Sequence, residues 1–388
     1  MNTKFFLFFS VFILIYGLTN YYIGLRGWQA LNSISTLRHL GWYWVGGVFI
    51  LSLAFPFGRW AISFLPHNLS KVTIFIGSYW LAMMYYLFLF LLIFDLLRLI
   101  IRLTGILPLA LRGHSSELIL GILILVALIV IYGSWNAQHP VISNYEITID
   151  KKSSTVDTMR IVMVSDIHLG WIVGVDRLEK MTGLINSLRP DLVLFPGDII
   201  DEGVDLAAEE AMPNILGTLN PHWGSYAAMG NHEYISGNAD AAIQLLNLGG
   251  VKVLRDQSIE VENCFYIVGR DDASRERFNG SGRMDLSALM ADVDKDRLPV
   301  ILLDHQPLKL ELAEKEGIDL QFSGHTHLGQ FFPNNYITRA IFEKDWGYYR
   351  KGNLQLIVSC GFGTWGPPIR IGNRPEILNI LVHLSPNK

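Results

Sequence analysis

The stretch "DLQFSGHTHLGQ" (residues 319–330) places two histidines directly after an apolar segment. Leu320 and Phe322 are typical of a buried strand, so His325 and His327 are expected where that strand reaches the surface. Positions i and i+2 of an extended backbone point to the same side, and both rings could therefore face one metal ion. The alternative is a polar loop that contains two histidines, because two histidines do not make a site.

The composition divides the chain into two parts. At 388 residues it is long enough for two or three domains. Residues 1–140 contain eight Lys or Arg and two Asp or Glu. The remainder contains 23 Lys or Arg and 33 Asp or Glu. The front third is therefore basic and sparsely charged, and the rest is acidic with the composition of a globular domain.

Four apolar segments of the front third predict membrane-spanning helices, at about 5–23, 40–57, 72–97 and 116–133. Residues 4–19 could instead be a signal peptide, but no small-residue cleavage site follows them and three further segments do. Aromatic residues cluster at the segment ends, as membrane interfaces favour. We predict a multi-pass plasma-membrane protein with a transmembrane region at 1–134, a short linker at 135–140 and a globular domain at 141–388.

One acidic residue lies near the third predicted helix. Asp95 could mark an intramembrane proton or ion site. It also lies three residues before Arg98, a spacing that favours an ordinary helical ion pair at the membrane interface. The ion pair is the preferred interpretation.

The distribution of basic residues bears on topology. The first and third predicted loops, on one side of the membrane, together contain five arginines. The segments on the other side of the membrane contain three basic residues, or five if Lys151 and Lys152 are counted. This difference favours an extracytoplasmic position for the N-terminus and the globular domain. Two cysteines, Cys264 and Cys360, are compatible with either compartment.

From residue 141 onward, short β-rich runs alternate with helical segments. Examples are "TMRIVMVSDIHLG" followed by "VDRLEKMTGLINSLRP", and then "DLVLFPGDIID". Strands that alternate with helices indicate an α/β domain with buried sheet. No internal repeat is visible.

Five of these strand ends carry side chains that can bind a metal. In open α/β sheets, ligands gather at the carboxyl ends of strands, so the five ends together predict a site where one alone would not. Each end taken singly also fits an ordinary turn or a buried histidine. The candidates are Asp166, His168, Asp198, Asn231, His232, His305, His325 and His327.

The order of these motifs resembles the calcineurin-like metallophosphoesterases. The matching segments are "SDIHLG", "PGDIID", "GNHEY", "DHQP" and "SGHTHLGQ", and the resemblance covers about residues 141–388. The ending "VSCGFGTWGPPIRIGNRPEI" is similar to a bacterial membrane-associated branch often linked to hydrolysis of UDP-2,3-diacylglucosamine. The resemblance implies a four-layer αββα sandwich. The four-helix front end is not part of the superfamily motif.

The resemblance also implies a binuclear metal centre. One divalent ion would be held by Asp166, His168, Asp198 and His327, and the second by Asp198, Asn231, His305 and His325. Mixed nitrogen and oxygen ligands suit Mn, Fe or Zn. His232 would act beside the leaving group as an acid or electrostatic stabiliser, and Asp166 would in addition orient His232.

A second glycine pattern has a different interpretation. "GFGTWG" (361–366) spells the dinucleotide-binding motif, but Pro367 and Pro368 follow and no helical pattern begins. We expect a tight loop beside the metal site. Aromatic residues that could line its rim, or else belong to the core or ordinary surface, are Trp171, Phe331, Phe332 and Trp365.

The sequence thus predicts a membrane-anchored phosphoesterase that hydrolyses a phosphodiester or pyrophosphate bond. About eight residues join the last predicted span to the first strand, which favours a lipid-linked substrate such as a UDP-diacylglucosamine-type glycolipid, with the bilayer as partner and no nucleic acid. An extracytoplasmic domain conflicts with a UDP-sugar made in the cytosol. The alternatives are an anchored phosphodiesterase for soluble nucleotides and a non-catalytic scaffold.

Overall fold

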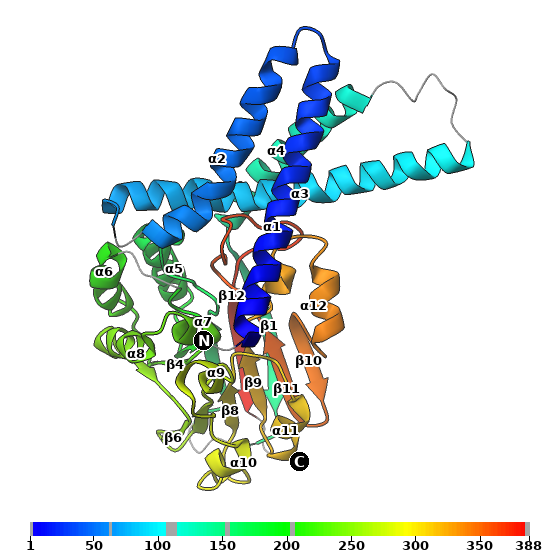
Figure 1. The fold of residues 1–388 in the computed structure, drawn as a ribbon. Helices are drawn as coiled ribbons and strands as arrows, with labels where there is room; N and C mark the ends of the chain where they lie inside the picture. The colour runs from blue at the N-terminus through cyan, green and yellow to red at the C-terminus, as the bar shows by residue number, and fades with distance from the viewer. Residues whose placement is uncertain (1–2, 62–63, 106–114, 152–155, 202–205, 385–388) are drawn as a thin grey trace. The chain divides into compact units, whose positions relative to one another are not determined.

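The chain forms two compact units (Figure 1). The computed structural model describes residues 3–61, 64–105, 115–151, 156–201 and 206–384. One unit comprises Met1–Ser134 with Gly366–Pro368, and the other comprises Trp135–Trp365 with Ile369–Lys388. We call the second the catalytic unit.

The first unit consists of long apolar helices. They are α1 (Thr3–Ser33), α2 (Gly41–Trp60), α3 (His67–Thr104) and α4 (Ser115–Ala137), with a 3-10 turn η1 (Arg38–Leu40) before α2. Among the described residues, three helical segments are long and apolar enough to cross a bilayer: Arg38–Trp60, His67–Thr104 and Ser116–Ala137. The protein is therefore a membrane protein, and the fourth span, in α1, stays a prediction.

The helix α3 is longer than the sequence pattern predicted. Its 38 residues correspond to about 57 Å at 1.5 Å per residue, whereas the hydrocarbon core of a bilayer is about 30 Å thick. The helix ends where Gly105 adopts a left-handed conformation at φ +70°, a common way to stop a helix. Apolar content therefore marks the span, and the glycine marks the end of the helix.

Asp95 pairs with a different arginine from the one we predicted. Its carboxylate accepts hydrogen bonds from Arg26 Nε of α1 at 2.8 Å and from the Tyr22 hydroxyl at 2.5 Å. The pair with Arg98 is therefore not the one that forms. The predicted spacing considered only α3, whereas the Asp95 side chain reaches α1, and the ion pair ties the two helices together.

This ion pair generates a stability prediction. Arg26→Gln should lower the free energy of unfolding by about 1–2 kcal/mol, because it leaves a half-buried carboxylate with one charged partner fewer. Arg98→Gln is the matched control and should change it by less than about 0.5 kcal/mol. Denaturant unfolding of the full chain in detergent measures both values. Equal losses in the two variants would contradict the assignment.

The catalytic unit contains two six-stranded sheets. The first has the strand order β1-β12-β2-β3-β4-β5: β1 (Val141–Ile149), β12 (Glu376–Leu384), β2 (Thr158–Met163), β3 (Leu192–Pro196), β4 (Ser225–Ala228) and β5 (Val251–Val253). The second has the order β10-β11-β9-β8-β7-β6: β10 (Gly347–Lys351), β11 (Leu354–Val358), β9 (Leu320–Ser323), β8 (Val300–Leu303), β7 (Phe265–Gly269) and β6 (Gln257–Val261). Strands β2 to β5 are parallel, as are β7, β8, β9 and β11.

Three buried clusters confirm the four-layer sandwich. Between the sheets, apolar residues of both interdigitate, including Ile161 and Leu194 from one sheet and Ile301 and Phe322 from the other. A second cluster joins the first sheet to α5 (Val175–Ser187), α6 (Leu206–Leu216) and α8 (Ala239–Leu248). A third joins the second sheet to α10 (Leu286–Leu289) and α11 (Leu310–Lys315). Each sheet thus has one face on the other sheet and one face under helices (Figure 1).

Candidate metal centre

All seven predicted metal ligands lie just beyond the carboxyl ends of central strands. Asp166 and His168 follow β2, Asp198 follows β3, and Asn231 begins the short helix α7 (Asn231–Ile235) after β4. From the other sheet, His305 follows β8, and His325 and His327 follow β9. Because these strands are parallel within each sheet, their ends meet at one edge of the sandwich.

The candidate side chains form three overlapping groups whose ligand atoms lie within 4.8 Å of one another. The groups are Asp166, His168 and His327; His168, Asp198 and His232; and Asp198, His305 and His325. Asp198 belongs to two of them, the position expected for a carboxylate that serves two ions. Asn231 joins through its side-chain oxygen, 2.8 Å from His325 Nδ1.

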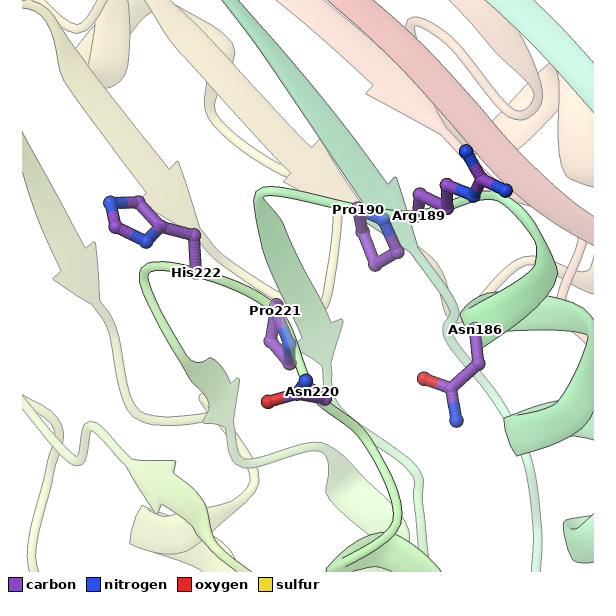
Figure 2. Close-up of a pocket in the computed structure, with 6 residues that line it drawn as sticks. All are labelled: Asn186, Arg189, Pro190, Asn220, Pro221 and His222. Atoms are coloured by element: carbon purple, nitrogen blue, oxygen red, sulfur yellow. The ribbon is translucent and has the colours of Figure 1, made fainter.

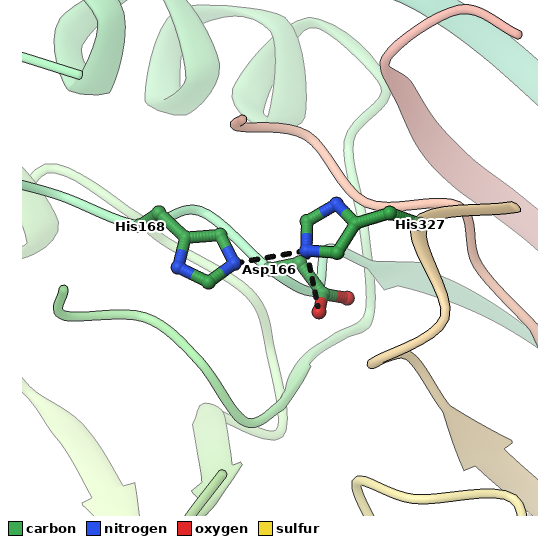
Figure 3. A group of neighbouring side chains, drawn as sticks. All are labelled: Asp166, His168 and His327. Atoms are coloured by element: carbon green, nitrogen blue, oxygen red, sulfur yellow. Dashed lines mark hydrogen bonds and ion pairs between the residues drawn. The ribbon is translucent and has the colours of Figure 1, made fainter. Parts of the chain in front are cut away.

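The two histidines of the opening stretch contribute to different groups. His327 Nε2 lies 3.0 Å from His168 Nε2 and 3.5 Å from Asp166 Oδ1 (Figure 3). His325 lies instead with His305 and Asp198. The two rings therefore belong to different groups of candidate ligands and do not share one. β9 ends at Ser323, and both histidines have positive φ, so the backbone turns between them.

Two glycines let the ligand loops approach one another. A Cβ at Gly230 would overlap the carboxylate and backbone N–H of Asp198, and a Cβ at Gly324 would overlap the side chains of Ser165 and Asp166. Any other residue at either position would push apart two strand ends that carry candidate ligands.

The backbone of the site is unusual. Five candidate ligands have φ between +49° and +71°, a region that non-glycine residues rarely adopt: Asp166, His168, Asp198, His325 and His327. Such conformations cost about 1–3 kcal/mol each and persist only where surrounding contacts determine them. Their concentration here identifies these loops as a functional site.

The hydrogen bonds of His305 show that a cation fits here. Its Nδ1 lies 2.8 Å from the carbonyl of Pro196, which can only accept, so Nδ1 carries a proton. Its Nε2 lies 3.0 Å from Asp198 Oδ2, and both atoms are buried. A proton on Nε2 or a metal ion bound by both atoms would satisfy this pair, since imidazole nitrogens and carboxylate oxygens are common metal ligands.

The electrostatic field of the site also favours positive charge. Burial alone would lower the pKa of His305, but the negative charges of Asp198 and Asp166 raise that pKa well above its ordinary value. Burial would likewise raise the pKa of Asp198, and the neighbouring imidazoles hold it well below the usual range. The carboxylate thus stays ionised while fully buried.

Asp201 is a functional residue that the sequence reasoning missed. Its carboxylate lies 2.9 Å from His232 Nδ1 and 3.7 Å from His168 Nδ1. Burial opposes ionisation of Asp201, yet the neighbouring His168 and the hydrogen-bonded His232 keep its pKa far below the usual range. We predicted an orienting role at His232 for Asp166, whereas the carboxylate described at His232 Nδ1 is Asp201. The repeated Asp in "GDIID" is the signal that could have identified it.

Glu233 organises the loops around Asp198. This buried carboxylate accepts hydrogen bonds from the backbone N–H groups of Asp198, Ile199, Ile200 and Gly230. Burial raises the pKa of Glu233, and the charge of Asp198 raises it further. Its role is to fix the backbone that presents Asp198 and His232.

A loop after β11 closes another side of the site. Within "GFGTWG", the N–H of Phe362 donates to Ser165 and that of Gly363 donates to Asp166. The buried Arg370 donates to the carbonyls of Gly361 and Gly363, and its Nη2 lies 3.2 Å from His327 Nδ1. The predicted tight loop beside the ligands is therefore present, and no helix begins in it.

The catalytic unit also has a surface hollow, whose lining residues are drawn in Figure 2. It has a volume of about 650 Å³ and is lined by Asn186, Arg189, Pro190, Asn220, Pro221 and His222. These residues precede β3 and β4, so the hollow is at the amino ends of strands whose carboxyl ends carry the candidate ligands. It contains none of the predicted site residues.

Comparison with known proteins agrees with this geometry. The profile of the calcineurin-like phosphoesterase family matches residues 159–329. A "Transmembrane protein with metallophosphoesterase domain" of Danio rerio is 32% identical over 352 residues, which cover 86% of this chain and 79% of that protein. An uncharacterized metallophosphoesterase of Campylobacter jejuni is 30% identical over 386 residues, which cover 96% of this chain and 97% of that protein.

The position of Asp201 leads to a prediction. Asp201→Asn should lower the rate of phosphoester hydrolysis about 10–100-fold, because the amide no longer fixes the orientation and charge of His232 and His168. Turnover of bis(p-nitrophenyl) phosphate at saturating Mn²⁺ measures the effect. Asp294→Asn, an exposed substitution on the same unit, is the control. Wild-type turnover by the Asp201 variant would contradict the assignment.

Proposed function

Because the chain belongs to the calcineurin-like metallophosphoesterases, we propose that it is a membrane-anchored hydrolase with a two-metal centre. Its substrate would be a phosphodiester or pyrophosphate linked to a lipid. The metal-dependent phosphoesterase activity follows from family membership and the clustered ligands. The number of metals and the lipid-linked substrate are the parts that we add.

The metals would be held by the two sides of the ligand cluster. Asp166, His168 and His327 would bind one ion, Asn231, His305 and His325 the other, and Asp198 would bridge them. This donor set of imidazoles and carboxyl or amide oxygens suits Mn, Fe or Zn. When bound, such a pair would supply an activated water and positive charge for the phosphoryl oxygens.

In this proposal, His232 protonates the leaving group. Its backbone N–H donates to Asp198 Oδ1 at 2.8 Å, which fixes the residue beside the predicted bridging carboxylate. Asp201 is bound to Nδ1, so Nε2 is the nitrogen that can deliver a proton. Asp201 also stabilises the protonated imidazole before that transfer.

The proposal of a lipid-linked substrate rests on the connection of the last span to the site. Asn136, in the final turn of α4, is buried in the catalytic unit and donates to the carbonyls of Arg370 at 2.9 Å and Asn373 at 2.7 Å. Asn373 in turn donates to the carbonyl of His327 at 3.0 Å. Two hydrogen-bonded steps thus join a spanning helix to a candidate ligand.

The length of the linker leads to the same conclusion. Only residues 138–140 separate α4 from β1, and three residues extend to about 10 Å at most. The first strand of the catalytic unit therefore begins close to the end of α4 along the chain. A substrate whose phosphate lies at the membrane surface suits a site tethered in this way.

Two substitutions separate metal binding from proton transfer. Asp198→Ala should lose both bound metal and turnover, because it removes the shared ligand, whereas His232→Ala should keep the metal and lose about 10²–10⁴-fold in rate. Metal analysis by mass spectrometry and turnover of bis(p-nitrophenyl) phosphate by the detergent-solubilised full chain measure the two properties. Full turnover in either variant would contradict the assigned roles, and Asp294→Ala serves as the exposed control.

A substrate screen tests the lipid-linked part. The full chain in nanodiscs should hydrolyse lipid-linked pyrophosphates, including a UDP-diacylglucosamine, with higher kcat/KM than UDP-glucose or other soluble nucleotides. Chelator-treated enzyme is the control for metal dependence. A preference for the soluble nucleotides would leave an anchored phosphodiesterase, and hydrolysis of no phosphoester at all would favour a scaffold.

A further inference from the structure

We propose that the outer face of α12 (Asn335–Ile341) is a bilayer-contact surface. We call this face, made of Tyr336, Ile337 and Ile341, the α12 surface. Its apolar side chains would insert into the headgroup region of the membrane. This contact would hold the metal centre at a fixed distance from the membrane surface. This inference uses the tether described above and does not depend on the identity of the substrate.

Exposed apolar side chains are concentrated in this part of the catalytic unit. Eleven large hydrophobic side chains are exposed among the described residues after Val141, and seven of them lie between residues 332 and 365. Those of the α12 surface are exposed by 62%, 58% and 63%. Contiguous exposed apolar residues mark interaction sites, whereas isolated ones are ordinary.

The helix α12 leaves its large apolar side chains exposed. Tyr336, Ile337 and Ile341 are exposed together with Arg339, whereas Thr338 is half-buried and donates to Asp345 Oδ2 at 2.8 Å. A surface helix normally buries its apolar side. Because α12 buries none of these side chains, we infer that they have a partner outside the folded domain.

The α12 surface is rigidly connected to the metal centre. Asp345, which anchors α12, also accepts from the Thr326 hydroxyl through its backbone carbonyl at 2.6 Å. Thr326 lies between the candidate ligands His325 and His327. At the end of α12, the ring of Phe342 lies 5.9 Å from that of His325. A partner that fixed α12 would therefore also fix the ligand loop.

An exposed indole lies beside the catalytic histidine. Trp365 is 56% exposed, and its ring lies 6.0 Å from that of His232. The side chain of Gln330 holds the Trp365 peptide at both ends, accepting from its N–H at 2.9 Å and donating to its carbonyl at 3.0 Å. Gln330 precedes α12 by five residues, so the same short segment presents both the α12 surface and the indole.

The bilayer is the occupant that the chain itself supplies. Spanning helices precede the catalytic unit, and Asn136 ties the end of α4 to the loop that contacts His327. Two hydrogen-bonded steps therefore connect the end of a spanning helix to the candidate ligand His327. Tyr and Trp with Ile around a short helix, together with the exposed Arg339, have the composition of interfacial membrane contacts.

Spin labelling of the full chain tests this contact. Ile337→Cys and, as a second position, Ile341→Cys would carry a nitroxide, and Leu248→Cys, which is 76% exposed on α8, is the matched control. The native Cys264 and Cys360 are buried. The measurement is made in nanodiscs of phosphatidylcholine and phosphatidylglycerol. It gives the ratio of the collision rate with O₂ to the collision rate with a water-soluble nickel chelate. This ratio should be several-fold higher for the labels at 337 and 341 than for the label at 248.

The outcomes are distinct. Relaxation of the labels at 337 and 341, but not at 248, by nitroxide-labelled lipids would support the contact. Equal nickel accessibility at all three positions would overturn it, and so would spin–spin broadening at 337 without any effect of lipid, since that result identifies a second copy of the chain. Thermal unfolding in detergent verifies that each labelled variant is folded. No substrate is used, so failure here leaves the proposed function standing, and failure of the lipid substrate leaves this surface standing.

Discussion

The site depends on the close approach of Asp198 and His305, which come from different sheets. Their facing atoms are 3.0 Å apart in a fully buried environment. A carboxylate oxygen and an imidazole nitrogen from these two sheets are held at that distance only if the sheets pack with their carboxyl ends together. The apolar layer between the sheets provides this packing. The hydrophobic core therefore determines the geometry of the polar centre.

Much of the architecture was predictable because short segments of the sequence determine it. Runs of apolar residues predicted the long helices of the first unit and the buried strands of the second, and each ligand-bearing turn was visible as a short motif after a strand. The resemblance added the order of the layers. The local pattern did not predict where helices end, as α3 shows. Apolar content indicates the part of a helix that can cross the membrane, and a helix can continue beyond that part.

The parts of the site that escaped prediction are contacts between distant segments. His325 and His327 are two residues apart, yet they join different groups of candidate ligands because their backbone leaves the extended region. Asp95 was assigned a neighbour on its own helix, whereas its partner Arg26 is 69 residues away. Asp201 was not among the predicted site residues, and its contact with His232 joins segments 31 residues apart. In each case the deciding information is tertiary.

The buried amide of Asn136 has a practical consequence for anyone who wishes to study the catalytic unit without its membrane helices. A truncation at the first strand, residue 141, would remove the donor that the carbonyls of Arg370 and Asn373 share. The last helical turn, from Trp135, belongs to the folded unit. A soluble version should begin there, with solubilising substitutions on the outside of that turn.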